Sequence, residues 1–285
     1  MTRFWLTVLL GLLGICAYAA VPERPRFRII GASQGLPSTD IKALARDRDG
    51  YLWVGTADGL ARHDGVGMRV WRHDPELADG LPGNNVQALL VDAEDRIWVA
   101  VEGEGVSVLD ANRQHFTRYR KASHPALESD DVWAMAKQGH AVWLGTFGGG
   151  LTRIDGAGGQ RHFSKAKDGL PSDTVLSLAE DAQGGLWVGT TAGLAHLRGD
   201  TFERVALPDA EGAAMIYALS AQADGLWVGS SQGIWRQVAG QWTQPAWSPM
   251  FQRPNAMLAI VTGAEGEHWL GSQRGLWHQQ GNAPP

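Results

Sequence analysis

A short phrase centred on tryptophan recurs six times along the chain at nearly constant spacing. The copies, "LWVGT" and close variants of it, lie 40 to 45 residues apart and are centred on Trp53, Trp98, Trp143, Trp187, Trp227 and Trp269. A catalytic motif normally occurs once, whereas a recurring phrase describes a repeated structural unit. A period of about 40–45 residues is typical of one blade of a β-propeller, so the chain is predicted to form six blades.

Each repeat divides into four short segments with the pattern of β-strands. The first segment begins 11 or 12 residues before the tryptophan, and its third residue is always small: Ala43, Ala88, Ala134, Ser177, Ala218 and Ala259. The first strand of a blade lines the propeller axis, where neighbouring blades crowd together. The second strand carries the tryptophan, the third follows a turn that contains glycine, and the fourth is polar enough for an outer edge.

The tryptophans and the glycines that follow them are predicted to have structural roles. A large aromatic side chain would fill the gap between blades as that gap widens away from the axis. The glycines would supply backbone angles that other residues reach only with strain. The composition agrees, because 37 glycines and 13 tryptophans in 285 residues suit short strands, tight turns and aromatic packing.

The sixth repeat lacks a fourth strand of its own. It reaches only its third strand, "GLWHQQ" at residues 275–280, while an additional strand-like segment, "RFRII" at residues 26–30, precedes the first blade. Pairing these two segments would leave no open blade edge. The expected fold class is therefore all-β: a six-bladed β-propeller of four-stranded antiparallel blades, closed by the N-terminal strand. The alternative is an open arc in which residues 26–30 are only a frayed end.

The first 19 residues have the layout of a secretory signal peptide. Arg3 precedes an apolar run at residues 4–16, which the small-residue site Ala17-Tyr18-Ala19 follows. We expect cleavage after Ala19, export to the periplasm, and a propeller at residues 20–285. The apolar run is too short to span a bilayer, and no later segment approaches the required length of about 18 residues. The mature chain is therefore not expected to insert into a membrane.

Three phrases go beyond a generic propeller. They are "GLP" before the first strand, at residues 35–37, 80–82 and 169–171, "LWVGT" in the second strand, and "GTFGGGL" at residues 145–151. Together they resemble the two-component regulator propeller family, the periplasmic sensor repeats of hybrid histidine kinases and related diguanylate cyclases. The chain departs from the pattern at Ala100, where the other copies have glycine, and the fifth and sixth repeats lack "GLP".

This resemblance implies a non-enzymatic periplasmic propeller that senses a ligand for a signal-transduction system. It also implies a membrane-bound kinase or cyclase output module as partner. We expect either a free-standing propeller or a fragment of such a sensor. Two alternatives from other functional classes stay open: a secreted propeller enzyme of the lyase or lactonase type, and a scaffold that binds an envelope protein.

Motifs that carry catalytic or metal chemistry find little support. The segment "GSSQG" at residues 229–233 matches a nucleophile elbow, but it occupies the same turn as "GTADG" in the first repeat. The acidic turn that begins at Asp47 lacks the other ligands of a calcium loop and is predicted to be a tight turn. The nine histidines have no metal-ligand spacing, so no metal or cofactor is expected. With a net charge of -5 and no run of basic residues, nucleic acid is not an expected partner.

Residues that break the repeat are the best candidates for ligand binding, because the fold does not require them. We look for them where the segments leading into first strands and the turns between second and third strands lie at the same face. The candidates there are Glu102, Glu104, Asp130, Asp131, Trp133, Phe147 and Arg274. A group of carboxylates facing one arginine would suit a polar or cationic small molecule.

Overall fold

The computed structural model describes residues 27–77, 79–208, 210, 213–252, 254–263, 267–280 and 285. The chain divides into two units, Met1–Ile30 and Gly31–Pro285. In the first unit only residues 27–30 are described, and none of them belongs to a strand. The predicted signal peptide and its cleavage site lie outside the described residues.

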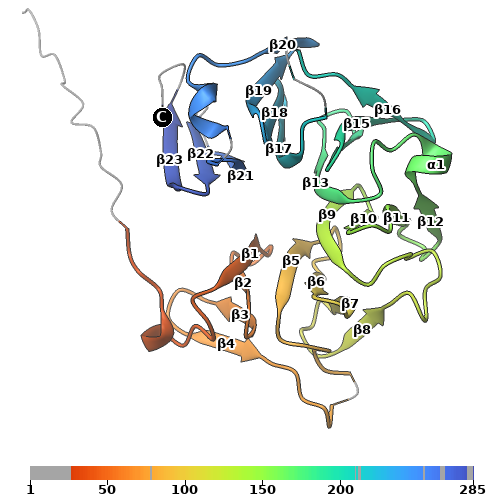
Figure 1. Ribbon diagram of the computed structural model, residues 1–285. Coiled ribbons are helices and arrows are strands. Elements are labelled where there is room, and N and C mark those ends of the chain that lie inside the picture. Colours follow the sequence, from red (N-terminus) through yellow and green to blue (C-terminus); the bar gives the residue numbers. More distant parts are fainter. Residues whose placement is uncertain are drawn as a thin grey trace, which may run out of the picture. The chain divides into compact units, whose positions relative to one another are not determined.

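The second unit is a six-bladed β-propeller, as predicted (Figure 1). Five blades are four-stranded antiparallel sheets whose strands follow one another in sequence order, and the sixth has three strands. Blade one contains β1 (Ile41–Arg46), β2 (Leu52–Thr56), β3 (Gly59–His63) and β4 (Met68–Trp71). Blade two contains β5 (Val86–Val91), β6 (Ile97–Val101), β7 (Gly105–Leu109) and β8 (Phe116–Tyr119). Blade three contains β9 (Val132–Gln138), β10 (Ala141–Thr146), β11 (Leu151–Ile154) and β12 (Gln160–Phe163).

The remaining blades repeat this arrangement. Blade four contains β13 (Val175–Glu180), β14 (Leu186–Thr190), β15 (Gly193–Arg198) and β16 (Thr201–Val205). Blade five contains β17 (Ile216–Gln222), β18 (Gly225–Ser230), β19 (Gly233–Val238) and β20 (Gln241–Thr243). Blade six contains β21 (Met257–Thr262), β22 (Glu267–Ser272) and β23 (Gly275–Gln280). The helical turns η1 (Ala32–Gln34), α1 (Lys165–Asp168) and η2 (Ser248–Phe251) lie in connecting segments.

The first strands are innermost (Figure 1), and those of consecutive blades lie side by side from β1 through β5, β9, β13 and β17 to β21. This confirms the axial position predicted from the small third residue. Ala88, Ala134 and Ala218 are buried there. The side chains that fill the spaces between blades alternate along the strands, which places the main core in layers between neighbouring sheets.

The repeated tryptophans fill the spaces between blades, as predicted. Five of them are between 0 and 7% exposed, whereas Trp269 in blade six is half-buried. In blades one to three an aromatic side chain from the fourth strand contacts the tryptophan of the same blade; Trp71, for example, stacks on Trp53 with ring centroids 5.1 Å apart. The indole nitrogen also has a polar partner, since Trp53 Nε1 donates to Asp47 Oδ2 at 2.8 Å. The turn that begins at Asp47 is thus a tight turn, and its carboxylate anchors the core tryptophan.

The glycine two residues after the repeated tryptophan, present in every blade except blade two, does not have the role predicted for it. Gly55 and Gly229 have no left-handed backbone angle. A side chain at Gly55 would instead lie 2.7 Å from Val86 Cγ1, and one at Gly229 would lie 2.7 Å from Met257 Cγ. Both neighbours begin the first strand of the following blade, so glycine is needed for close approach of that blade. Left-handed angles occur at the glycines that begin third strands, such as Gly59 with φ 123°.

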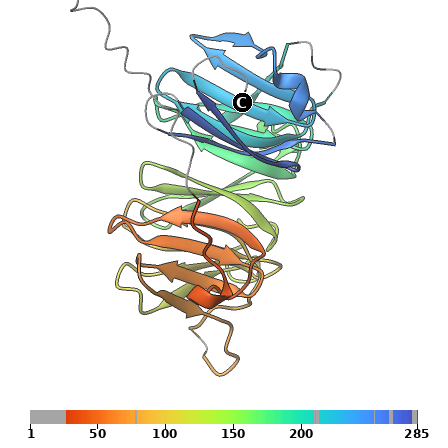
Figure 2. The ribbon, with the colours of Figure 1, turned by 90° about the vertical axis from the view of Figure 1, so that its left-hand side faces the viewer.

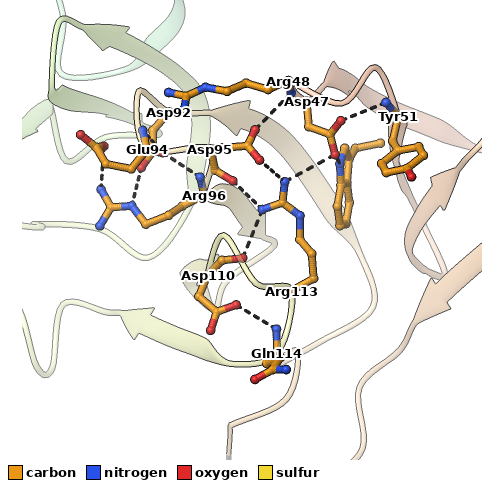
Figure 3. Close-up of polar contacts among 11 residues, drawn as sticks. Asp47, Arg48, Tyr51, Asp92, Glu94, Asp95, Arg96, Asp110, Arg113 and Gln114 are labelled. Atoms are coloured by element: carbon orange, nitrogen blue, oxygen red, sulfur yellow. Dashed lines mark hydrogen bonds and ion pairs between the residues drawn. The ribbon is translucent and has the colours of Figure 1, made fainter.

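A buried arginine joins the first two blades (Figure 3). Arg113 lies between β7 and β8, and its side chain is 8% exposed. The Nη2 atom is 2.6 Å from Asp95 Oδ2 and 3.4 Å from Asp47 Oδ2, and Asp47 belongs to blade one. The guanidinium also lies over the ring of Trp53, at 5.5 Å from its centroid. These charges satisfy one another inside the junction, so we assign the cluster a structural role.

The predicted closing strand does not occur among the described residues. Residues 27–30 have no strand conformation, Arg26 lies outside the described residues, and the described sheet of blade six consists of β21, β22 and β23. Figure 2 faces the interval between blade six (blue) and blade one (orange) and shows them apart. Apolar side chains that face this interval are poorly buried: Leu44 in β1 and Val261 in β21 are each 61% exposed.

Candidate functional site

A β-bulge interrupts every first strand at its second residue. In blade one, for example, Ile41 pairs with Thr56 and Ala43 pairs with Gly55, so that the residue between them has no partner in the ladder. The same shift occurs in all six blades. We call the residues at this position the bulge residues: Lys42, Gln87, Trp133, Leu176, Tyr217 and Leu258. Bulges often occur next to functional sites, where they redirect a side chain.

The bulge residues differ from their neighbours in how freely they vary. The residues before them are apolar in every blade, and the residues after them are always alanine or serine. The bulge residues themselves include a cation, an amide, two aromatic residues and two leucines. The fold therefore fixes the flanking positions and leaves the bulge position free. They lie at the end of the propeller that also holds the turns between second and third strands, which we call the bulge face.

Three of the predicted site residues come together in blade three. The Trp133 and Phe147 rings contact each other, with centroids 5.1 Å apart and planes inclined by 34°. Asp131 holds both of them: its Oδ1 accepts a hydrogen bond from Trp133 Nε1 at 2.9 Å, and its carbonyl oxygen accepts one from the Phe147 N–H at 2.9 Å. Trp133 is 44% exposed and Phe147 is 51% exposed. The result is an open aromatic surface beside a carboxylate.

Three further predicted residues lie at the adjoining part of the bulge face. Glu102 is exposed and accepts a hydrogen bond from the side-chain amide of Asn85. Glu104 forms an ion pair with Arg120 at 2.9 Å. Asp130 accepts a hydrogen bond from the Lys121 N–H at 2.7 Å, and its carbonyl oxygen accepts one from Gly105 at 2.9 Å. These backbone bonds tie the turn of blade two to the segment that leads into blade three.

Arg274 does not join this group. It lies in the turn between β22 and β23 of blade six, where its N–H donates to Asn255 Oδ1 at 3.2 Å. Within the part of the chain that the structure describes, no ion pair connects it to a carboxylate. The arrangement of carboxylates facing this arginine therefore stays a prediction. Lys42 is the cation among the bulge residues, and it pairs with Asp40 at 3.0 Å.

Trp133 is the one bulge residue among the candidates predicted from the sequence; the other five bulge residues were not predicted. The prediction selected residues that break the repeat in turns, whereas the bulge residues lie within a regular strand segment. The sequence did contain a signal for these residues, because the second position of the first strand varies among the six repeats while the positions on either side of it are uniform. A bulge cannot be seen in a sequence without its pairing partner, so its consequence for the side chain was not foreseen.

One cavity, of about 300 Å³, borders the bulge face, where Pro171 and Ala192 line it beside the turn from β14 to β15. Two other cavities lie away from this face. One of them, of about 650 Å³, lies beside Trp227 and Trp247 and includes Gln279 of blade six. Another, of about 420 Å³, contains a buried pair in which His196 Nε2 lies 2.7 Å from Asp181 Oδ2. Burial pushes the pKa of Asp181 upward, but hydrogen bonds from Gly185 and His196 outweigh it and hold the pKa below its usual value. The His196 ring packs on Trp187 with centroids 4.1 Å apart, so we assign the pair a structural role.

The search for metal and nucleophile chemistry gives two observations. In the described ranges, no group of three or more histidine, cysteine, aspartate or glutamate side chains is arranged to hold a metal ion. The segment at residues 229–233 forms the turn from β18 to β19, where Ser230 Oγ donates to the Gly233 carbonyl oxygen at 3.1 Å. This strand–turn–strand context differs from the strand–turn–helix that a nucleophile elbow requires.

Comparison with known families identifies the repeats. Three segments match the two component regulator propeller model, at residues 35–58, 80–103 and 169–192. Each match runs from the "GLP" lead through the first and second strands to the following turn, in blades one, two and four. A search of curated proteins finds no match.

Solved structures share the fold at low sequence identity. The extracellular domain of B. thetaiotaomicron BT4673, described as a hybrid two component system, is 20% identical with a TM-score of 0.72, and the match covers 88% of this chain and 33% of that one. The corresponding domain of BT3049 is 20% identical with a TM-score of 0.65, over 90% and 42%. Virginiamycin B lyase from Staphylococcus aureus is 13% identical with a TM-score of 0.63, over 86% and 85%. The chain thus spans about a third of the length of the first of these structures.

Proposed function

Because the chain contains repeats of the two component regulator propeller family, we propose that it is a non-enzymatic sensory propeller that binds a small ligand at the bulge face. The observation that carries this proposal is the set of bulge residues. Six equivalent positions surround the axis at one face, and their chemistry varies although the fold is repeated. Functional residues placed at loops and bulges of a rigid scaffold are a common arrangement in binding proteins.

The proposal includes export. The leader at residues 1–19 supports removal after Ala19 and action in the periplasm, which agrees with the extracellular location of the similar domains of BT4673 and BT3049. Among the described residues there is no helix long and apolar enough to cross a membrane. Sequencing of the exported protein should begin at Ala20-Val21-Pro22. A leader that stayed attached would contradict this part of the proposal.

A kinase or cyclase module in the membrane is the proposed receiver of the signal. In the similar structures the matched propeller is a minor part of a longer chain. We propose that ligand binding at the bulge face biases the contact between the propeller and this module. An envelope protein that uses the same face is the alternative partner.

Ligand binding is tested by thermal unfolding of the mature chain with a panel of small molecules. The panel includes sugars, amino acids, nucleosides and organic cations. We expect at least one compound to raise the melting temperature, because a ligand that binds only the folded state stabilises it. The triple variant Lys42→Ala, Gln87→Ala and Trp133→Ala should lose this increase.

The control variant carries Arg48→Ala and Gln183→Ala. Both residues are exposed in turns between first and second strands, at the opposite end of the blades. It should respond to the ligand as the wild type does. If both variants respond equally, the bulge face is not the binding site.

An enzyme of the lyase type is a second candidate, since virginiamycin B lyase has a similar propeller. Mass spectrometry of the compound after incubation separates the two functions. Recovery of the unchanged compound supports a sensor, whereas a product that forms in proportion to protein concentration supports an enzyme.

A further inference from the structure

Trp133 and Phe147 form an aromatic surface that the fold itself does not need. Both rings are about half exposed, whereas the tryptophan of the same blade, Trp143, is 1% exposed. Exposed aromatic residues that contact each other at a variable position are unusual in a core-forming repeat, because burying them would be favourable. Their exposure leaves part of each ring available to a partner.

The two rings are held in place before any ligand arrives. The Asp131 carboxylate fixes Trp133 through its indole N–H, and the Asp131 carbonyl oxygen fixes the backbone of Phe147. A site that is already ordered loses less entropy on binding. Asp131 therefore positions both halves of the aromatic surface.

The charge around this surface is negative. In the described part of the chain, no cationic side chain forms an ion pair with Asp131, Asp130 or Glu102. Glu104 pairs with Arg120, which neutralises one of the four carboxylates, and the nearby cation Lys121 pairs with Glu128, which is not one of them. A cation would thus be attracted to this part of the bulge face, and an anion would be repelled.

We propose that the Trp133–Phe147 surface binds the head group of an organic cation that carries a trimethylammonium group. This inference rests on the proposed function and names the ligand class for the same face. A cation is attracted to the faces of aromatic rings, and quaternary ammonium groups are typically recognised by such rings. The Asp131 carboxylate supplies the opposite charge at the edge of the surface. A trimethylammonium group needs no hydrogen-bond acceptor, which fits a carboxylate that already accepts the Trp133 N–H.

The test compares choline with 3,3-dimethylbutan-1-ol, which has the same shape and no charge. Isothermal titration of the mature chain should give a dissociation constant for choline that is at least about tenfold lower than for the neutral alcohol. Trp133→Leu and Phe147→Leu should each weaken choline binding about five- to tenfold. Asp131→Asn should weaken it more at low salt than at high salt, because salt screens exposed charges.

Gln183→Ala is the matched control. It changes an exposed residue in the turn between β13 and β14, at the opposite end of the blades from the bulge face, and should leave choline binding unchanged. Melting temperatures of all variants show whether each is folded, and the exposed positions of Trp133 and Phe147 predict small changes.

Three results would overturn the inference: no choline binding, equal binding of choline and the neutral alcohol, or choline binding that survives Trp133→Leu and Phe147→Leu. These outcomes differ from failure of the proposed function. If the panel yields a neutral or anionic ligand whose effect depends on the bulge residues, the proposed function stands and the organic-cation inference is wrong.

Discussion

The guanidinium of Arg113 in blade two lies 3.4 Å from the carboxylate of Asp47 in blade one, and both side chains are buried. The same carboxylate accepts the N–H of Trp53. One residue thus links the charge of the second blade to the core tryptophan of the first. Removing one partner of a buried pair is costly, because it leaves the other charge without compensation.

Arg113→Met is therefore expected to lower the free energy of unfolding by about 3–5 kcal/mol. Arg120→Ala breaks the more exposed pair with Glu104 and should cost about 0–1 kcal/mol. Urea unfolding of both variants checks this. Equal losses would show that Arg113 is not a structural link between the blades.

The core tryptophans should contribute different amounts to the free energy of unfolding, depending on whether another blade packs against them. Trp143→Ala should cost about 3–5 kcal/mol, the usual range for a buried large aromatic residue. Trp269→Ala should cost clearly less, because Trp269 is only half-buried. Phe147→Leu, at the exposed bulge face, should change stability by no more than about 0.5 kcal/mol. If all three variants melted at the same temperature, the division into core and bulge-face aromatics would be wrong.

Glycine at the end of the second strand should matter only where another blade follows. A side chain at Gly145 would approach Val175 of blade four too closely, whereas one at Gly271 would have only ordinary contact with Ala259 of its own sheet. Gly145→Ala is expected to cost about 1–3 kcal/mol through overpacking, and Gly271→Ala should be nearly neutral. Blade two has Ala100 at the equivalent position, and its methyl group is fully buried, so the junction between blades two and three accommodates one additional methyl group.

Stability should fall on mild acidification because of His268. Burial, and then the nearby charge of Arg236, hold the pKa of His268 below its usual value of 6.5. As the pH falls below about 6.5, the unfolded chain therefore binds a proton that the folded chain resists. Neutral His268 therefore contributes its full stabilisation above pH 6.5, and this contribution is lost as the pH falls below that value.

Urea titrations between pH 8 and pH 5 test this expectation. The free energy of unfolding should decrease in this range for the wild type. The decrease should be smaller for His268→Gln, which has no proton to bind there. Parallel curves for the two proteins would contradict a role for His268.

Much of the fold could be predicted from the sequence because each blade repeats the same strand arrangement with the same pattern of residues. The tryptophan spacing predicted six blades, and the small third residue predicted which strand lies at the axis. Contacts that occur in only one blade are harder to predict from the sequence. Arg113 contacts Asp47 across 66 positions and has no counterpart in the other repeats, so no periodic pattern reveals it.

The site was predicted only in part, for a related reason. Asp131, Trp133 and Phe147 interrupt the repeat, and they come together as their positions suggested. Lys42, Tyr217 and the other bulge residues depend on a pairing shift that no single strand displays. The closing strand at residues 26–30 was inferred from a count of strands. Such a count shows where a strand is missing, but it does not measure the surface that a strand would bury.

The central claim is that the propeller recognises its ligand at the bulge face. Hydrogen–deuterium exchange tests it most directly, with the mature chain measured alone and with a compound that raises its melting temperature. We predict slower exchange at the start of β9 and in the turn from β10 to β11, around Trp133 and Phe147. The turns between first and second strands, such as the one at Asp47, should be unchanged. Protection confined to those turns, or to the cavity beside Trp227 and Trp247, would contradict the account.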